Sequence, residues 1–178
     1  MGRVVCTDTP VKEVRREPDR DLPFEFEFCV PGRVQPKERH RFSTIGGAHT
    51  YTPRNTADYE ALVKAYYRKA GGKYYGNLRL HVTVDAYIAF PKSYSKNKVR
   101  ELWESGLCPT AKPDCDNILK SILDAMNNVA YRDDSAVVSV ACRKQYAAPG
   151  SEGFVRVVIR LGEMPESGFL MRHPSAVE

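Results

Sequence analysis

The stretch KPDCDNILKSILDAMNNVAYRDDSAVV, residues 112–138, predicts a helix, a turn and the start of a strand. Its apolar residues recur three or four positions apart, which places them on one side of a helix. They are Ile118, Leu119, Ile122, Leu123 and Met126. Asp116 is well placed to cap this helix at its N-terminus, and Asn127 and Asn128 are typical of its end.

Alternation of apolar and polar side chains predicts strands at residues 24–30 and 78–90, and two more at 135–146 and 154–161. The apolar face of the first comprises Phe24, Phe26, Phe28 and Val30. That of the second comprises Leu78, Leu80, Val82, Val84, Ala86, Ile88 and Phe90.

A helix is predicted from a cap at Asn55 or Thr56 to Lys69, and a short basic helix from a cap at Ser95 to about Gly106. The apolar side of the longer helix comprises Tyr59, Leu62, Val63 and Tyr66. Residues 31–53, interrupted by prolines and glycines, fit a loop or irregular hairpin. This order of elements favours an α+β fold, a single domain in which a mixed β-sheet packs with a few helices.

The globular domain is predicted to span residues 23–162, between a flexible leader at 1–22 and a flexible C-terminal tail at 163–178. No apolar run approaches the roughly 18 residues that cross a bilayer, and the N-terminus lacks a signal-peptide pattern. We therefore expect a cytoplasmic protein without membrane contact. The five cysteines form no C-x-x-C pair, which disfavours a structural zinc site and favours reduced thiols.

Although the chain carries a net charge of +5, five aspartates gather around the helix of the quoted stretch. Asp114 and Asp116 are two positions apart, so an extended lead-in points both to the same side. Asp116, Lys120 and Asp124 fall at i, i+4 and i+8, on one polar face of the helix. Asp133 and Asp134 follow in the turn, and they return to the helix start only if the tertiary fold brings them there.

Two interpretations of this cluster remain open on spacing alone. In the structural one, Asp116 caps the helix, Lys120 and Asp124 form an exposed ion pair, and Asp133 and Asp134 are turn residues. In the functional one, the aspartates hold Mg²⁺, a hard cation that prefers carboxylate oxygens. A phosphodiester could then be hydrolysed by metal-activated water, with Lys120 binding the phosphate.

The order of these residues resembles the signature of the RusA-like Holliday-junction resolvases, endodeoxyribonucleases of bacteria and their prophages. The matching positions are Asp114, Asp116, Asn117, Lys120, Asp124–Ala125 and Asp133–Asp134. The segments PGRVQPKERHRF, YTP and FPKSYSKNK also resemble phage-type members in order and spacing. The resemblance covers roughly residues 24–161, nearly all of the predicted globular part.

The resemblance implies a RusA-like fold and a homodimeric, Mg²⁺-dependent nuclease that cuts four-way DNA junctions, with Mn²⁺ able to replace Mg²⁺. It implies catalytic roles for Asp114, Asp116, Lys120 and Asp134. The implied metal ligands are Asp114, Asp116 and Asp134, with Asp133 beside them.

Two basic segments are candidates for contact with the DNA backbone. The first follows the strand at 24–30 and contributes Arg33, Lys37, Arg39 and Arg41. The second precedes the quoted stretch and contributes Lys92, Lys96 and Lys98. Tyr51, Tyr94 and Trp103 could stack on exposed bases, although the pattern favours core packing for Trp103.

Other classes of protein fit less well. A non-catalytic module of the same fold that binds structured DNA is the main alternative, but all the acidic positions and Lys120 are present. A PD-(D/E)xK nuclease needs its lysine on a strand, whereas Lys120 is predicted in a helix. A phosphatase or polymerase with paired aspartates would be expected to carry further phosphate-binding or nucleotide-binding motifs, and none, such as G-x-x-x-x-G-K-[ST], is evident in the sequence.

Overall fold

The computed structural model describes residues 17–37, 41–43, 49–51 and 53–162, with the backbone alone for 41–43 and 49–51. Along the chain its elements are β1 (Glu25–Pro31), β2 (Arg41–Ser43), β3 (His49–Tyr51), α1 (Arg54–Lys69), β4 (Leu80–Ile88), α2 (Lys96–Glu104), α3 (Cys115–Met126), the single 3₁₀ turn η1 (Asp134–Ala136), β5 (Val137–Tyr146) and β6 (Gly153–Leu161).

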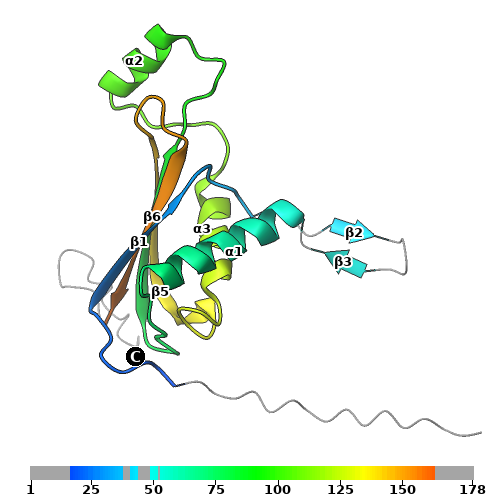
Figure 1. Cartoon of the computed structure of the whole chain (residues 1–178), viewed down its shortest axis with the longest axis vertical. Coiled ribbons are helices and arrows are strands. Elements are labelled where there is room, and N and C mark those ends of the chain that lie inside the picture. The colour runs from blue at the N-terminus through cyan, green and yellow to red at the C-terminus, as the bar shows by residue number, and fades with distance from the viewer. Residues whose placement is uncertain (1–16, 38–40, 44–48, 52, 163–178) are drawn as a thin grey trace, which may run out of the picture.

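Four strands form one mixed sheet in the order β1-β6-β4-β5. β4 runs parallel to β5 and antiparallel to β6, which in turn runs antiparallel to β1. Helices α1 and α3 pack against each other, and they contact β1 and β5 respectively (Figure 1). The predicted α+β fold with a mixed sheet and a few helices is therefore confirmed.

The short strands β2 and β3 pair antiparallel as a separate hairpin, which projects from the N-terminal end of α1 (Figure 1). This confirms the irregular hairpin expected within residues 31–53.

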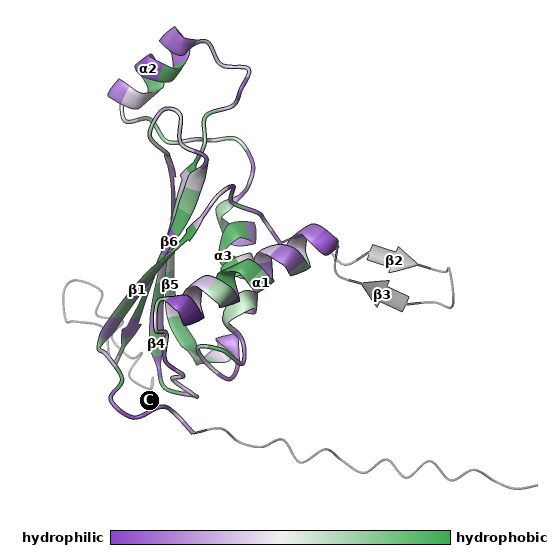
Figure 2. Cartoon of the chain, in the orientation of Figure 1, coloured by the Kyte–Doolittle hydropathy of each residue, from purple (hydrophilic) through white to green (hydrophobic). Residues whose placement is uncertain are grey.

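The core lies between the sheet and the two helices. Alternate strand residues such as Phe28, Val82 and Val157 are buried, and α3 adds the stripe of Ile118, Ile122, Ala125 and Met126. Figure 2 shows the corresponding hydrophobic colouring on the strands and on α3. Burial of these apolar side chains is the main source of stability for the packing of the helices on the sheet.

Some predicted core positions are exposed. Phe24 lies before β1 and is 63% exposed, and Leu78 precedes β4. On α1 the buried residues are Thr56, Tyr59, Val63 and Tyr67. Tyr67 is therefore an additional core residue, Tyr66 packs half-buried against the core, and Leu62 is exposed.

The N-caps of the two longer helices, α1 and α3, lie earlier in the chain than the sequence predicted. Pro53 is the N-cap of α1, and Asp114 rather than Asp116 is the N-cap of α3. The backbone of Asp114 is extended, and its carbonyl accepts a hydrogen bond from the N–H of Ile118, the first helical bond. Asp116 therefore lies inside the first turn. The predicted cap at Ser95 is confirmed, since its side chain accepts from the N–H of Lys98.

Charged side chains join the strands on the face away from the helices. The Asp85 carboxylate is 3% exposed and accepts two hydrogen bonds from Arg143, at 2.7 and 3.1 Å. Arg156 bridges Asp85 and Glu27, which connects β6 to both of its neighbours. The buried carboxylate is thus compensated by two guanidinium groups.

Part of the predicted leader contacts the folded unit. The N–H of Asp19 donates to the carbonyl of Tyr74, and the N–H of Tyr74 donates to the Asp19 carboxylate at 2.8 Å. The domain boundary at residue 22 stays a prediction.

None of the helices in the described ranges is both long and apolar enough to cross a membrane.

Candidate active site

The two ends of the four-stranded sheet differ in what they carry. At one end, called here the arm end, β1 and β4 finish at Pro31 and Ile88 and β6 begins at Gly153. The arm, residues 89–113 with α2, extends beyond this end (Figure 1). At the opposite end β4 and β5 begin, at Leu80 and Val137.

Asp114 and Asp116 lie at the arm end, at the start of α3. Both are exposed, and the Asp114 side chain makes no capping hydrogen bond to the helix. The partial positive charge of a helix N-terminus favours carboxylates in this position. The two carboxylates are therefore two residues apart at one helix end, and both are accessible to solvent.

Lys120 is one helical turn beyond Asp116 and is exposed as well. Positions i and i+4 are neighbours on a helix surface. The opposite side of the helix, with Ile118, Ser121 and Ile122, is buried. The core thus fixes α3 so that Asp116 and Lys120 share its solvent face, as predicted.

The peptide segment before Asp114 is held by a residue that the sequence interpretation missed. Lys144, near the end of β5, donates from Nζ to the carbonyl oxygens of Ala111 and Pro113, each at 3.0 Å. Its strand position gives the signal that could have identified it: Lys144 follows Cys142 by two residues and so points to the same, helix-covered face.

Asp124 does not pair with Lys120, as the structural interpretation expected, but with Lys37. The Lys37 ammonium lies 2.9 Å from Asp124 Oδ2 and 2.5 Å from Glu60 Oε1, and its side chain is 13% exposed. Burial disfavours the charged form, but the hydrogen bonds to both carboxylates outweigh it and raise the pKa of Lys37. Lys37 therefore ties its loop to α1 and α3, which argues against its predicted role as a phosphate contact.

Asp133 and Asp134 lie at the opposite end of the sheet, where Asp133 precedes η1 and Asp134 begins it. Asp133 caps this turn by accepting from the N–H of Ser135 at 3.0 Å, and hydrogen bonds from Ser135 lower the pKa of Asp133. Asp134 is the first residue of η1 and is exposed.

One chain does not bring the two pairs of aspartates together. The 12 residues of α3 span about 18 Å, with Asp114 at the N-terminal end of the helix and Asp134 in the turn η1 near its C-terminal end. Because β5 starts beside the C-terminal end of α3, the turn stays at that end. Within the part of the chain that the structure describes, no three His, Cys, Asp or Glu side chains are grouped to hold a metal ion.

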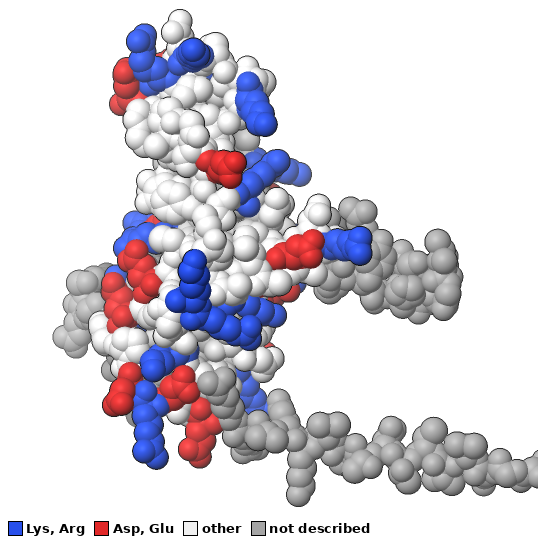
Figure 3. Space-filling model, in the orientation of Figure 1, with Lys and Arg blue, Asp and Glu red and all other residues white. Residues whose placement is uncertain are grey.

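The basic candidates are distributed over three places. Arg33 is exposed in the loop after β1, at the arm end. Lys92, Lys96 and Lys98 are exposed on the arm, and Lys98 lies 3.4 Å from Glu101. Figure 3 shows Lys and Arg side chains on the arm with a few acidic ones. Arg39 lies outside the described residues, and Arg41 is described by its backbone in β2.

The chain has relatives among known proteins. The family model of endodeoxyribonuclease RusA matches residues 31–160. A protein of Bacillus subtilis (strain 168), the uncharacterized protein YqaN, is 44% identical over 141 residues, which cover 76% of this chain and 95% of that protein.

Proposed function

The chain belongs to the RusA family of endodeoxyribonucleases, and we propose that it resolves four-way DNA junctions by paired, Mg²⁺-dependent phosphodiester cleavage. The observation that carries this proposal is the exposed group of Asp114, Asp116 and Lys120 on α3. It lies at the same end of the sheet as the basic residues Arg33 and Lys96. A nuclease needs such a combination, because the site must hold a cation and a polyanion at once.

The donor set fits Mg²⁺. This ion is usually held by one or two carboxylates together with waters and substrate phosphates, rather than by a closed protein cage. Asp114, the N-cap of α3, and Asp116, in its first turn, offer two exposed carboxylates that are open to both water and DNA. When bound there, Mg²⁺ would activate water and neutralise charge on the scissile phosphate.

The other residues have roles that follow from their positions. Lys120 would bind a non-bridging oxygen of the scissile phosphate, since its ammonium shares the solvent face of α3 with Asp116. Lys144 would keep the peptide before Asp114 in place through its two carbonyl contacts. Lysines of the arm and Arg33 would contact phosphates on either side of the cut.

Asp134 can join this site only from a second copy of the chain, because α3 separates it from Asp114 within one chain. Two chains related by a two-fold axis across α3 would set the C-terminal end of one helix beside the N-terminal end of the other. We therefore propose a homodimer in which Asp134 of the partner subunit completes each site. Two such sites would also supply the two symmetric cuts that junction resolution requires.

The substrate defines the place of action: junctions in bacterial or phage DNA are resolved in the bacterial cytoplasm, in recombination and repair.

The proposal is tested by incubating the chain with a synthetic four-way junction and with a linear duplex of the same sequence, in Mg²⁺, in Mn²⁺ and in EDTA. We expect symmetric nicks in the junction with either ion and none in EDTA. Junction binding without cleavage under all conditions would instead favour the non-catalytic DNA-binding module.

A further inference from the structure

The arm carries aromatic and apolar side chains that the fold leaves exposed. No residue of α2 is buried, Trp103 is 47% exposed, and Tyr94 is 38% exposed. Core packing, which the sequence favoured for Trp103, is therefore wrong. Trp103 shares adjoining hollows with the exposed side chains of Tyr94 and Leu107, and an exposed apolar group of this kind marks an interaction site more often than a single exposed residue does.

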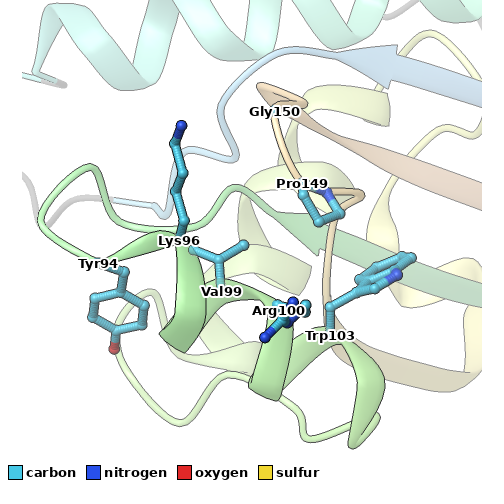
Figure 4. A pocket seen from close by; sticks show the side chains of 7 residues that line it. All are labelled: Tyr94, Lys96, Val99, Arg100, Trp103, Pro149 and Gly150. Atoms are coloured by element: carbon cyan, nitrogen blue, oxygen red, sulfur yellow. The ribbon is translucent and has the colours of Figure 1, made fainter.

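Trp103 borders a hollow between α2 and the turn at Pro149–Gly150 that joins β5 to β6 (Figure 4). Its volume is about 460 Å³, within the range of small-ligand sites. Val99 and Trp103 form its apolar part beside Pro149, while Lys96 and Arg100 add two cations and Tyr94 stands at one edge. A second hollow of about 410 Å³ lies along Leu107 and Tyr146 and also touches Trp103.

This combination suits a nucleobase with its phosphates. A base has a flat π-face that stacks on indole, and stacking does not depend on base identity. The cations beside the indole match the negative charge of the adjoining backbone. A hollow of about 460 Å³ has room for a base that has left its duplex stack.

The charge of the arm argues against a second copy of the chain as the occupant. Residues 92–104 carry four cations, Lys92, Lys96, Lys98 and Arg100, against Glu101 and Glu104. A two-fold contact through this face would bring together two patches that each carry a net positive charge, because an isologous interface uses the same surface of both subunits. A polyanion relieves this repulsion instead.

We propose that the hollow between α2 and the β5–β6 turn binds an unpaired nucleobase at the branch point of the DNA. The indole of Trp103 stacks on this base, and Lys96 and Arg100 contact the phosphates that flank it. The proposal rests on the proposed function and adds to it a residue that selects branched DNA, in which bases can unstack, over a linear duplex.

The intrinsic fluorescence of the protein tests this directly, because Trp103 is the single tryptophan of the chain. The full chain in EDTA is titrated with a twelve-residue oligothymidylate, with a four-way junction that has unpaired thymines at its branch point, and with a blunt linear duplex. We expect the single strand and the junction to quench the Trp103 emission, and the duplex to leave it nearly unchanged.

Matched variants separate stacking from packing. Trp103→Phe keeps an aromatic face, whereas Trp103→Leu keeps apolar bulk without one. By fluorescence anisotropy of labelled DNA, Trp103→Leu should weaken single-strand binding by roughly 5- to 150-fold, the range that base–aromatic stacking gives, and Trp103→Phe by much less. Lys96→Ala with Arg100→Ala should lower the salt dependence of binding, while Lys73→Ala, an exposed lysine outside the arm, should not.

Three results would overturn the base site: anisotropy that reports binding with unchanged Trp103 emission, equal affinity of the Leu and Phe variants, or emission that changes with protein concentration and not with DNA. The last would make the hollow an interface between copies of the chain. Junction cleavage is measured on the same preparation. Cleavage without quenching removes the base site and keeps the proposed function, whereas quenching without cleavage does the reverse.

Discussion

The ammonium of Lys144 lies 3.0 Å from the carbonyl oxygen of Pro113, the residue that precedes Asp114. A second hydrogen bond of the same length reaches Ala111. A strand of the sheet thus fixes the peptide that carries the first carboxylate of the candidate site. The position of Asp114 depends on β5 as well as on α3.

Replacing Lys144 with methionine tests this dependence. The variant keeps an unbranched side chain of nearly the same length but loses both hydrogen bonds, so Asp114 should become less well positioned. We expect junction cleavage to fall about tenfold, the effect of roughly 1.4 kcal/mol, and more Mg²⁺ to be required for half-maximal rate. Lys144→Arg should recover part of the activity, and Lys73→Met serves as the control. An unchanged Mg²⁺ requirement would contradict the positioning role.

A second prediction concerns the ion pairs of Lys37. Lys37→Met removes the cation between Glu60 and Asp124 and leaves two partly buried carboxylates facing each other. Loss of a charged partner in such a setting costs about 1–3 kcal/mol, which urea unfolding would measure. Adding Asp124→Asn should restore part of the loss, because it removes the repulsion. If Lys37→Met weakens junction binding while stability is unchanged, Lys37 is a DNA contact after all.

The stability of the fold should fall in alkaline solution. Burial raises the pKa of Tyr59 and of Tyr75 to about 12, from about 10 for a free tyrosine. A raised folded-state pKa means that the unfolded chain loses its protons first, so stability is fully present below about pH 10 and falls as pH rises toward 12. In urea unfolding at a series of pH values, Tyr59→Phe should flatten this decline. An equally steep decline in Tyr59→Phe would exclude Tyr59 as a source.

Residues of the predicted leader should contribute to stability. A chain of residues 17–162 keeps the two hydrogen bonds between Asp19 and Tyr74, whereas a chain of residues 23–162 loses both. At about 1 kcal/mol for a typical hydrogen bond, we expect the shorter chain to be about 1–2 kcal/mol less stable in urea unfolding. Equal stability of the two chains would place the boundary at residue 22, as the sequence suggested.

Local patterns in the sequence predicted much of the fold. Alternation located β4 and β6, the apolar stripe located α3, and Ser95 was identified as a cap. The insertion of β4 between β5 and β6 could not be predicted in this way. Strand order depends on contacts between distant residues, and periodicity within one segment carries no information about them.

The same distinction applies to the candidate site. Asp114, Asp116 and Lys120 are close in sequence, so their common position on α3 followed from helix geometry. The position of Asp134 depends on where β5 starts, and the tertiary fold places it at the far end of α3. The partnership of Lys37 with Asp124 joins residues 87 positions apart and had no local signal.

Complementation tests whether two chains share each site. If Asp134 of the partner subunit acts with Asp116, then Asp116→Asn and Asp134→Asn chains should each be inactive alone. In a mixed dimer one site carries both substitutions and the other carries neither. We therefore expect a mixture of the two variants to nick one strand of the junction, as seen on denaturing gels. A mixture as inactive as either variant, although mixed dimers form, would place Asp134 outside the site.

The central claim is that Asp116 acts in metal-dependent cleavage rather than in folding or DNA binding. The most direct measurement is single-turnover cleavage of a four-way junction by the wild type and Asp116→Asn at saturating Mg²⁺, with binding measured on the same samples. Asn keeps the size of the side chain and removes its charge. The account predicts unchanged or tighter binding with a cleavage rate lower by about two orders of magnitude or more, since one carboxylate ligand is lost. Near-normal cleavage by Asp116→Asn would contradict it.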